Sequence, residues 1–417
     1  MKKIWKKKTQ TELKEKVFTA LNQNVSYIEE QVLGVPGSFL DAKVFNQDAP
    51  FLKEAPFLKA LLENPNHIGC HTLKKSEPFF KGTHALEKEL LDICAVDILK
   101  GNINDYDGYV ASGGTEANMQ AIWIYRNYFI KEFGSTNEEI VIICSKDSHY
   151  SIDKASNVLA VDLIKVEVQE ANRQLDISTL VETLQTAKTN GKKYFIVVCN
   201  MMTTMFGSVD NIEMYTQALK ELDLVYKIHI DGAYGGFYYP FSNEASLLTF
   251  KNPSISSFTL DAHKMAQSPY GTGIFLIRKG LIKYANTKEA SYVEGEDYTL
   301  IGSRSGANAI AVWMILSKHG PYGWFEKVYI LQKRTEWLVK RLDELDIKYF
   351  RNPFSNIVTI QSTQIDKSVA QKYWLVPDNH ITPKWFKIVI MEHVTIDILN
   401  QFIDYLKNSL QRRIPTP

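Results

Sequence analysis

Short runs of β-branched and aromatic residues alternate with amphipathic stretches between residues 109 and 277, and this alternation constrains the fold more than any other feature. The amphipathic stretches predict helices at 115–133, near 151–160, at 176–190 and at 211–222. Parallel strands need crossovers, which such helices supply, so the pattern predicts an α/β fold with a mostly parallel sheet covered on both faces. Ligands of such a sheet bind at the carboxyl ends of its strands. The seven predicted strands are Tyr109–Ala111, Ile140–Cys144, Leu163–Val168, Tyr194–Cys199, Lys227–Ile230, Ser257–Leu260 and Gly273–Ile277.

The regions before and after this alternation have different patterns. Helical segments at the start of the chain are broken by Gly34-Val35-Pro36-Gly37 and Asn64-Pro65-Asn66, which indicates an arm that packs on something else. We therefore expect three units: a helical arm at 1–65, a large ligand-binding domain at 66–306 and a smaller α+β domain at 307–417. The elements predicted for the small domain are helices at Ala307–Lys318, Trp324–Leu345 and Ile396–Leu410, and strands at Ile357–Gln361 and Trp385–Met391.

Charge and composition exclude several classes of partner. The 48 Lys and Arg nearly balance 47 Asp and Glu, so no overall field favours nucleic acid or an anionic membrane. No run approaches the ~18 apolar residues of a membrane span, and no secretory signal is recognisable. The basic segment Lys2–Lys8 is interpreted as the solvated start of a helix, with a membrane-surface anchor as the alternative. The cysteines form no CxxC pair, which indicates buried, reduced thiols in a cytoplasmic protein; they are Cys70, Cys94, Cys144 and Cys199.

Two residues at predicted strand ends carry candidate chemistry. Lys264 follows a buried strand in Phe258-Thr259-Leu260-Asp261-Ala262-His263-Lys264, where a desolvated lysine is a good Schiff-base nucleophile. A lysine whose head group merely reaches solvent is the alternative. Asp231 ends another strand before small residues and suits a pyridinium nitrogen. It could also cap a helix or bind Mg²⁺, but no DxD-type cluster accompanies it, so we predict no metal site.

Two further motifs follow the first two strands of the predicted sheet. The turn Ser112-Gly113-Gly114-Thr115-Glu116 joins a strand to a helix for which Thr115 is the expected N-cap, and helix N-termini attract phosphate. Most glycine turns bind nothing, but this one lies at the same sheet edge as Asp231 and Lys264. His149, after the second strand, could stack on an aromatic cofactor; a surface histidine is the alternative.

Six motifs in order, with a match from about residue 80 to 310, resemble the group II pyridoxal-phosphate amino-acid decarboxylases. Within that group the chain is most similar to short bacterial histidine decarboxylases and archaeal tyrosine/aspartate decarboxylases. The resemblance implies an aspartate-aminotransferase-like fold (fold type I) and conversion of an L-amino acid with an aromatic, imidazole or acidic side chain to the amine and CO2. The motifs are Ser112–Asn118, Ser148–Ser151, Thr203-Thr204 before Gly207–Asp210, Asp231–Tyr234, Asp261–Lys264 and Gly302–Gly306, and Met391–Thr395 resembles the family's small domain.

The resemblance assigns residues around the pyridoxal ring. It implies that Lys264 forms the Schiff base with pyridoxal 5′-phosphate, that Asp231 pairs with the pyridine nitrogen and that His149 stacks on the ring. These three are the predicted catalytic residues. Ala233 would pack under the opposite ring face, and Thr204 would lie near the 3′-oxygen or the pyridine edge.

The resemblance also assigns residues to the cofactor phosphate. Gly114, Thr115 and His263 would hold it, while Ser303 would reach the phosphate of the neighbouring subunit. This implies a homodimer with shared active sites. Asp261 is an acid beside the phosphate, which is favourable only where it accepts hydrogen bonds from neighbouring donors.

Alternatives from other classes stay open on the sequence. The cofactor residues are shared with carbon–carbon lyases of the sphingosine-phosphate lyase type and with decarboxylation-coupled aldehyde synthases. An aminotransferase would clamp the substrate carboxylate with Arg, which Trp385–Val389 lacks. A non-enzymatic scaffold is disfavoured because Lys264, Asp231 and His149 are present together. Tyr292 and Tyr298 are candidate proton donors. Six aromatic residues could line a substrate pocket, with core or interface packing as the alternative: Trp5, Phe79, Phe80, Tyr234, Tyr238 and Tyr239.

Overall fold

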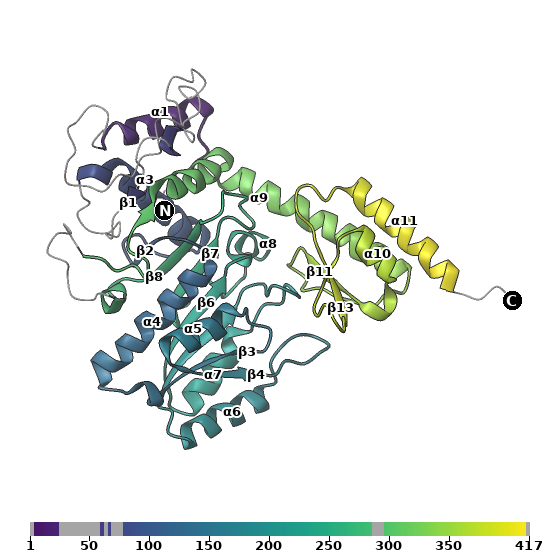
Figure 1. Cartoon of the computed structure of the whole chain (residues 1–417), viewed down its shortest axis with the longest axis horizontal. Helices are drawn as coiled ribbons and strands as arrows, with labels where there is room; N and C mark the ends of the chain where they lie inside the picture. The colour runs from purple at the N-terminus through teal and green to yellow at the C-terminus, as the bar shows by residue number, and fades with distance from the viewer. Residues whose placement is uncertain (1–3, 25–58, 62–65, 68–77, 286–295, 414–417) are drawn as a thin grey trace.

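The computed structural model describes residues 4–24, 59–61, 66–67, 78–285 and 296–413. Figure 1 shows a large domain and a smaller C-terminal domain, joined by the long helix α9 (Gly306–Glu344). The two-residue strands β1 (Asn66–His67) and β9 (Arg304–Ser305) pair with each other, and so tie together the two ends of the predicted large domain. The boundaries at residues 66 and 306 stay a prediction.

A seven-stranded sheet forms the centre of the large domain, and all seven predicted strands belong to it. The strand order is β2-β8-β7-β6-β5-β3-β4. Strand β8 runs antiparallel to both of its neighbours, and the remaining pairs are parallel, so the predicted mostly parallel sheet is confirmed. The strands are β2 (Tyr106–Ala111), β3 (Ile140–Ser145), β4 (Asp162–Val166), β5 (Tyr194–Asn200), β6 (Val225–Gly232), β7 (Ile255–Asp261) and β8 (Gly273–Arg278).

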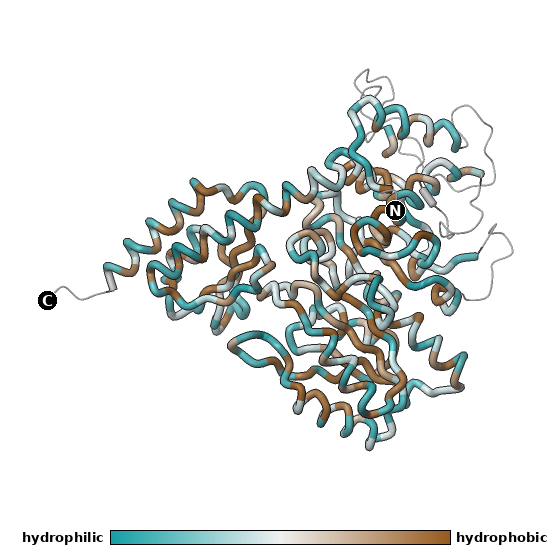
Figure 2. The backbone as a smooth tube through the Cα atoms, turned by 180° about the vertical axis from the view of Figure 1, so that it is seen from behind, coloured by the Kyte–Doolittle hydropathy of each residue, from teal (hydrophilic) through white to brown (hydrophobic). Residues whose placement is uncertain are grey.

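Helices cover both faces of this sheet because alternate strand residues are apolar on either side. In β3, Val141 and Ile143 pack into the same core as helices α6 (Ile177–Thr189) and α7 (Ile212–Glu221). Ile142 and Cys144 pack into the core formed with helices α4 (Gly114–Phe133) and α5 (Ser151–Leu159). In Figure 2 the apolar segments run through the middle of the domain, and the outer helices alternate between hydrophilic and hydrophobic colour.

The start of α4 differs from the sequence prediction. Gly113, and not Thr115, is the N-cap, and the helix begins at Gly114. Gly113 has a φ of 155°, a conformation that residues with side chains rarely adopt. Glu116 accepts the N–H of Ser112, which precedes the N-cap, at 2.5 Å, and the N–H of Gly114, the first residue of the helix, donates to the Asp261 side chain at 3.2 Å. Thr115 therefore lies within the first turn.

The small domain is an antiparallel sheet with helices on one face. Strand order is β10-β11-β13-β12, and β11 (Ile357–Gln361) pairs with β13 (Trp385–Val389) along its length. Its core is formed by Val358, Ile360, Phe386 and Ile388 with residues of α9 and α11 (Ile396–Arg413). The predicted strands and terminal helix are confirmed. The other elements of this domain are β10 (Tyr349–Phe350), α10 (Lys367–Lys372) and β12 (Val376–Pro377).

Helix α9 is kinked where the sequence predicted two helices, and the N-terminal segment completes the kink. Pro321 lacks an N–H, and Gly320 has non-helical dihedrals (φ 64°, ψ 174°). The freed carbonyl of Ser317 accepts the Lys8 N–H at 2.7 Å, and that of Leu316 accepts the Trp5 indole N–H at 2.6 Å. Buried carbonyls are thus satisfied from outside the helix.

The expectation that Lys2–Lys8 starts a solvated helix is therefore wrong for the described residues. Residues 4–9 are not helical, the indole of Trp5 is buried, and α1 (Gln10–Leu21) begins after the N-cap Thr9. Helix α1 packs on α3 (Lys81–Asp92) and α9 of its own chain. The short remaining elements are η2 (Pro78–Phe80), the π-helical η3 (Ile93–Ile98), η4 (Asn137–Glu139), η5 (Gly235–Phe237), α8 (Tyr239–Ser242), η6 (Ile282–Ala285) and η7 (Ser362–Gln364).

The burial of the cysteines and the hydropathy of the helices agree with what the sequence predicts. Cys94, Cys144 and Cys199 are buried free thiols, whereas Cys70 lies outside the described residues. Among the helices that the structure describes, none combines the length and the apolar character that crossing a bilayer requires.

Candidate active site

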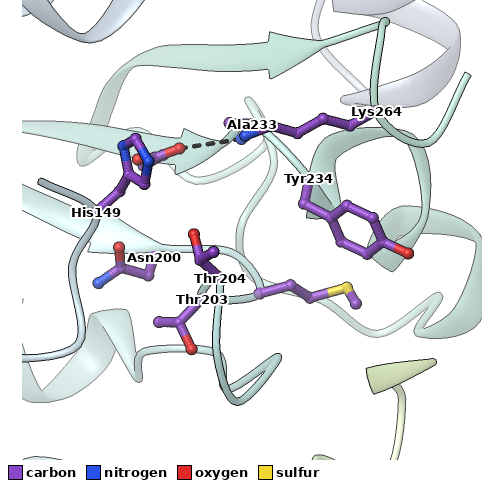
Figure 3. A pocket seen from close by; sticks show the side chains of 9 residues that line it. His149, Asn200, Thr203, Thr204, Ala233, Tyr234 and Lys264 are labelled. Carbon is purple, nitrogen blue, oxygen red and sulfur yellow. Dashed lines mark hydrogen bonds between the residues drawn. The ribbon is translucent and has the colours of Figure 1, made fainter. Parts of the chain in front are cut away.

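One pocket lies at the carboxyl ends of β3, β5, β6 and β7, where a sheet of this kind binds its ligand. Figure 3 shows His149 and Lys264 entering from opposite sides, with Thr204 pointing into the space between them. Five of the nine predicted site residues line it. The full lining is His149, Asn200, Met202, Thr203, Thr204, Asp231, Ala233, Tyr234 and Lys264.

Asp231 is held rigidly at the floor of the pocket. Its side chain is buried near the end of β6. Oδ1 accepts the Ala233 backbone N–H at 3.0 Å, and Oδ2 accepts the Asn118 side-chain N–H at 2.9 Å. Because both oxygens accept hydrogen bonds, the orientation of the carboxylate is set.

Lys264 lies in the turn after β7, and its side chain is 34% exposed. Its Nζ lies 3.6 Å from Asp261 Oδ2. The expectation that a lysine here is desolvated or engaged is met by this contact and not by burial. Burial raises the pKa of Asp261, and the nearby Lys264 cation and the His263 ring oppose that rise.

The His149 ring is oriented and uncharged near neutral pH. Burial lowers its pKa below the ordinary value of 6.5, and the Asp231 carboxylate partly opposes this. Nδ1 accepts the Ser151 N–H at 3.2 Å, and the ring lies on Tyr150 with centroids 4.2 Å apart. A neutral ring held in this way presents a flat face to the pocket.

The predicted phosphate residues adjoin the pocket without lining it. The Gly114 N–H donates to Asp261 Oδ2 at 3.2 Å, and a Cβ on Gly114 would lie 3.1 Å from both Ala233 Cβ and Asp261 Oδ2. His263 Nδ1 lies 2.8 Å from Asp261 Oδ1, although the two atoms do not meet hydrogen-bond geometry. Asp261 thus accepts one hydrogen bond, from the Gly114 N–H, and has Lys264 Nζ 3.6 Å away, so the expected set of donors around this acid is met only in part. Half-exposed Thr115 is in the first turn of α4.

Ser303 is not brought into this pocket. It is exposed, and it directly precedes strand β9 at the junction with the small domain. No interaction between Ser303 and the pocket residues is present among the parts of the chain that the structure describes. Its predicted role concerns a neighbouring subunit and stays a prediction.

The small domain makes three polar contacts with two residues that line the pocket, Tyr234 and Thr204. Tyr234 OH accepts the Asn356 side-chain N–H at 2.8 Å and lies 3.3 Å from Met391 Sδ. Lys387 Nζ donates to the Thr204 carbonyl at 3.0 Å. Burial, reinforced by the nearby Lys264 cation, lowers the pKa of Lys387. Strand β13 thus lacks the aminotransferase-type Arg but does bring one cation close to the pocket.

Comparisons with known proteins identify the chemistry that this geometry serves. The model of the pyridoxal-dependent decarboxylase conserved domain matches residues 84–349. The chain belongs to the pyridoxal-dependent decarboxylase family. The decarboxylase is 50% identical over 402 residues to a tryptophan decarboxylase of Clostridium sporogenes, with 96% of each chain covered. It is 30% identical to a histidine decarboxylase of Vibrio anguillarum, with 72% of this chain and 74% of the relative covered.

Solved structures share the fold of the decarboxylase. L-Methionine decarboxylase from Streptomyces sp. 590 superposes with a TM-score of 0.70 at 19% identity, covering 85% of this chain and 88% of that chain. Sphingosine-1-phosphate lyase from Burkholderia pseudomallei superposes with a TM-score of 0.68 at 19% identity, covering 79% of this chain and 77% of that chain. The predicted group II resemblance and fold type I architecture are confirmed. The decarboxylase is a carboxy-lyase that uses pyridoxal phosphate to decarboxylate an L-amino acid.

The pocket residues fit this cofactor. A pyridinium requires an anion, and the buried Asp231 carboxylate supplies one. A flat ring requires a shallow floor, and residue 233 is an alanine. Gly114 leaves space where a side chain would meet Ala233 and Asp261, so the start of α4 can approach a bound group closely.

Several residues of the decarboxylase site were missed from the sequence. Asn200 is the last residue of β5 and lines the pocket, so the strand-end rule that selected Asp231 could have found it. Its side chain donates to Asp210 at 2.8 Å, and burial raises the pKa of Asp210 to about 7. Asn118 and His229 lie behind Asp231, and nothing in a single sequence indicates their contacts.

The aromatic candidates separate clearly. Tyr234 lines the pocket. Phe79 packs on Phe80, with centroids 6.1 Å apart. Tyr298 is buried outside the pocket lining with its OH bonded to Glu296, and Tyr292 lies outside the described residues. The other four are core residues, as expected from packing: Trp5, Phe80, Tyr238 and Tyr239.

Proposed function

We propose that the decarboxylase acts on aromatic L-amino acids, with L-tryptophan as its principal substrate, and releases tryptamine and CO2. The observation that carries this proposal is the 50% identity to a tryptophan decarboxylase across 96% of both chains. The alignment therefore covers nearly the whole length of both proteins. The more distant histidine and tyrosine/aspartate decarboxylases are about 30% identical.

The chemistry of the pocket lining supports an aromatic substrate. Met202, Ala233 and Tyr234 contribute apolar or aromatic surface. Among the described lining residues, Lys264 and Asp231 are the charged ones, and the cofactor requires both. A substrate with an acidic side chain would need a further cation in the lining. A substrate with an imidazolium side chain would need a further acid there. An indole needs only apolar contact and one acceptor.

Three side chains are assigned to the reaction in this proposal. Bound pyridoxal phosphate supplies an electron sink for the pair released when the carboxylate departs. Asp231, as a carboxylate, keeps a proton on the ring nitrogen, and Lys264 Nζ holds the cofactor covalently. His149 stacks its neutral ring on the cofactor face, with Ala233 opposite, and Thr204 lies at the edge.

The proposed phosphate site is shared between subunits. Gly114, Thr115 and His263 hold the phosphate from one chain, and Ser303 of the partner subunit completes it. The exposure of Ser303 outside its own pocket supports a homodimer with shared sites.

The pairing of β1 with β9 supports a large cofactor-binding domain at 66–306, preceded by an arm and followed by the small domain at 307–417. Three buried thiols without disulfides support a cytoplasmic location.

A substrate panel tests the proposal. Purified protein with added pyridoxal phosphate is incubated with each of the twenty amino acids, and amine and CO2 are quantified. We expect the highest kcat/KM for L-tryptophan, with equal yields of tryptamine and CO2. A higher kcat/KM for histidine or aspartate would overturn the substrate, and keto acid without CO2 would indicate transamination. Sedimentation at assay concentration tests the dimer, because a fully active monomer is incompatible with shared sites.

A further inference from the structure

A continuous chain of hydrogen bonds runs behind the pocket and ends on the two residues that face the cofactor ring. It crosses from α4 to β7 and β6, and every member except His149 is buried. Its contacts link side chains that are far apart in the sequence, so the sheet packing alone brings them together. The chain runs from Tyr125 through Ser257 and His229 to Asn118, where it divides. One branch ends on Asp231, and the other passes through Ser151 to His149.

Chemistry fixes the direction of each bond, starting from Asp231. A carboxylate only accepts, so the Asn118 atom that lies 2.9 Å from Asp231 Oδ2 is the amide nitrogen. The Asn118 oxygen then faces His229 Nε2 at 2.9 Å, which requires that Nε2 carries a hydrogen. The same N–H also reaches Thr259 Oγ1 at 3.1 Å. A flipped amide would place two acceptors against each other.

The remaining bonds follow from the tautomer of His229. With its hydrogen on Nε2, the ring accepts at Nδ1, where Ser257 Oγ lies at 2.6 Å and donates. Tyr125 OH, bonded to Ser257, donates in turn. Burial lowers the pKa of His229 to about 4, so the ring stays neutral and keeps this arrangement at neutral pH.

The chain also branches to His149. The second Asn118 N–H donates to Ser151 Oγ at 2.9 Å. The Ser151 backbone N–H donates to His149 Nδ1 at 3.2 Å. One amide therefore bonds the acid that faces the ring nitrogen and also a residue that orients the stacking imidazole.

We propose that Asn118 and His229 are positioning residues for decarboxylation: they hold the Asp231 carboxylate in one orientation and fix its position relative to the His149 ring. Neither needs to touch the cofactor or the substrate. The proposal rests on the family's chemistry and is independent of which amino acid is the substrate. Removing the hydrogen-bond partners of metal ligands typically costs about 10- to 100-fold in activity, and we expect an effect of similar size for the partners of Asp231.

The test compares substitutions that keep or remove the donor toward Asn118. His229→Leu removes the donor, and His229→Gln keeps an N–H near the position of Nε2. Asn118→Ser and Asn118→Asp shorten the amide or replace it with a second acid. Thr335→Val is the matched control, because it removes a buried 2.7 Å bond to the Leu331 carbonyl, away from the pocket lining.

Four quantities are measured on each variant: kcat, KM, the dissociation constant of pyridoxal phosphate and the pH titration of bound-cofactor absorbance. We expect His229→Leu to lower kcat about 10- to 100-fold with little change in KM, and to shift the absorbance titration toward loss of the ring proton at lower pH. His229→Gln restores most of kcat. Asn118→Asp gives the largest shift, because two carboxylates then compete for one proton. Thr335→Val lowers the melting temperature only.

Three results would overturn the proposal. An unchanged kcat and titration in His229→Leu, with a stability loss like that of Thr335→Val, would make the network purely structural. Equal defects in His229→Gln and His229→Leu would show that the assigned donor direction is wrong. If His229→Leu does not fold, Asn118→Ser decides the matter, since it retains a polar group at the site and an unchanged titration there also overturns the proposal.

Discussion

The pocket is surrounded by two parts of different construction: the large-domain wall, which supplies all nine lining residues, and the small-domain wall, which contacts two of them, Thr204 and Tyr234, from outside the lining. The wall formed by the large sheet holds its reactive side chains in buried, mutually bonded positions, as the two accepted bonds of Asp231 illustrate. The small-domain wall contacts lining residues through side chains of different burial, from the buried Asn356 on Tyr234 OH to the half-exposed Lys387 on the Thr204 carbonyl. Electrostatic preorganisation requires fixed dipoles, and substrate entry requires a part that can adjust. The two walls divide these tasks.

The small domain also contacts the large domain through aromatic rings. Phe206, in the loop after β5, packs edge-on against Trp385 and Phe350, with centroids 5.8 and 5.9 Å away. The Arg173 guanidinium lies 3.9 Å over the same ring. Such contacts anchor the small domain without entering the reaction. Changes in the large-domain wall should therefore alter chemistry, and changes in the small-domain wall should alter binding.

The largest effect is expected from removing the covalent anchor. Lys264→Ala should lower decarboxylation by roughly 10³-fold or more, because Lys264 carries the one amine among the described residues that line the pocket. Borohydride reduction of the wild type with cofactor, followed by peptide mapping, should place the pyridoxyl group on Lys264. A label on another lysine would remove this residue from the large-domain wall as we describe it.

Neutralising the buried acid should give the next largest effect. Asp231→Asn keeps the shape and the hydrogen-bonding distance but cannot balance a protonated ring nitrogen. We expect kcat to fall about 10²- to 10³-fold, the size of one strong preorganised interaction, with the cofactor still bound. Full activity would mean that Asp231 has another role and that the two walls differ less than proposed.

The large-domain wall was predictable from the sequence because its signals are local. A strand ending in Asp231, a lysine following Asp261 and a glycine turn before α4 can each be recognised within a few residues. The strand-end rule then places them together without any knowledge of side-chain contacts. Even there, the N-cap was misplaced by two residues, because Gly113 alone accepts the required backbone conformation.

The network behind the wall and the small-domain contacts were not predictable in the same way. His229 reads as an ordinary member of a buried strand, and its partners Asn118 and Ser257 are distant in the sequence. The sequence predicted a helix for the extended N-terminal segment. It is extended because Trp5 and Lys8 donate hydrogen bonds to carbonyls that are left free near Pro321, far along the chain. Long-range pairing of buried polar groups leaves no periodic signal.

Buried His229 should make the fold sensitive to acid. Its pKa is lowered from 6.5 to about 4, so between these values the unfolded chain binds a proton that the folded chain does not. Stability contributed by the neutral ring is present above pH 6.5 and is lost as pH falls toward 4, by up to about 3 kcal/mol. Urea unfolding at several pH values measures this loss.

The matched comparison for that measurement is His229→Gln, which does not titrate. The difference in unfolding free energy between wild type and variant should shrink as pH falls from 6.5 to 4. Buried His84, whose pKa is also about 4 because of burial, remains in both proteins and cancels. A difference that stays constant with pH would show that the buried network does not exclude the proton.

The smallest effect is expected from the small-domain wall. Lys387→Met keeps the aliphatic length but loses the bond to the Thr204 carbonyl. We expect KM to rise a few-fold with kcat nearly unchanged, about 1 kcal/mol, because a single half-exposed bond between the domains is lost. Lys384→Met, on an exposed residue beside the same strand, should leave both constants unchanged. A large fall in kcat for Lys387→Met alone would place this cation among the reacting groups, and the division between a chemical wall and a binding wall would then fail.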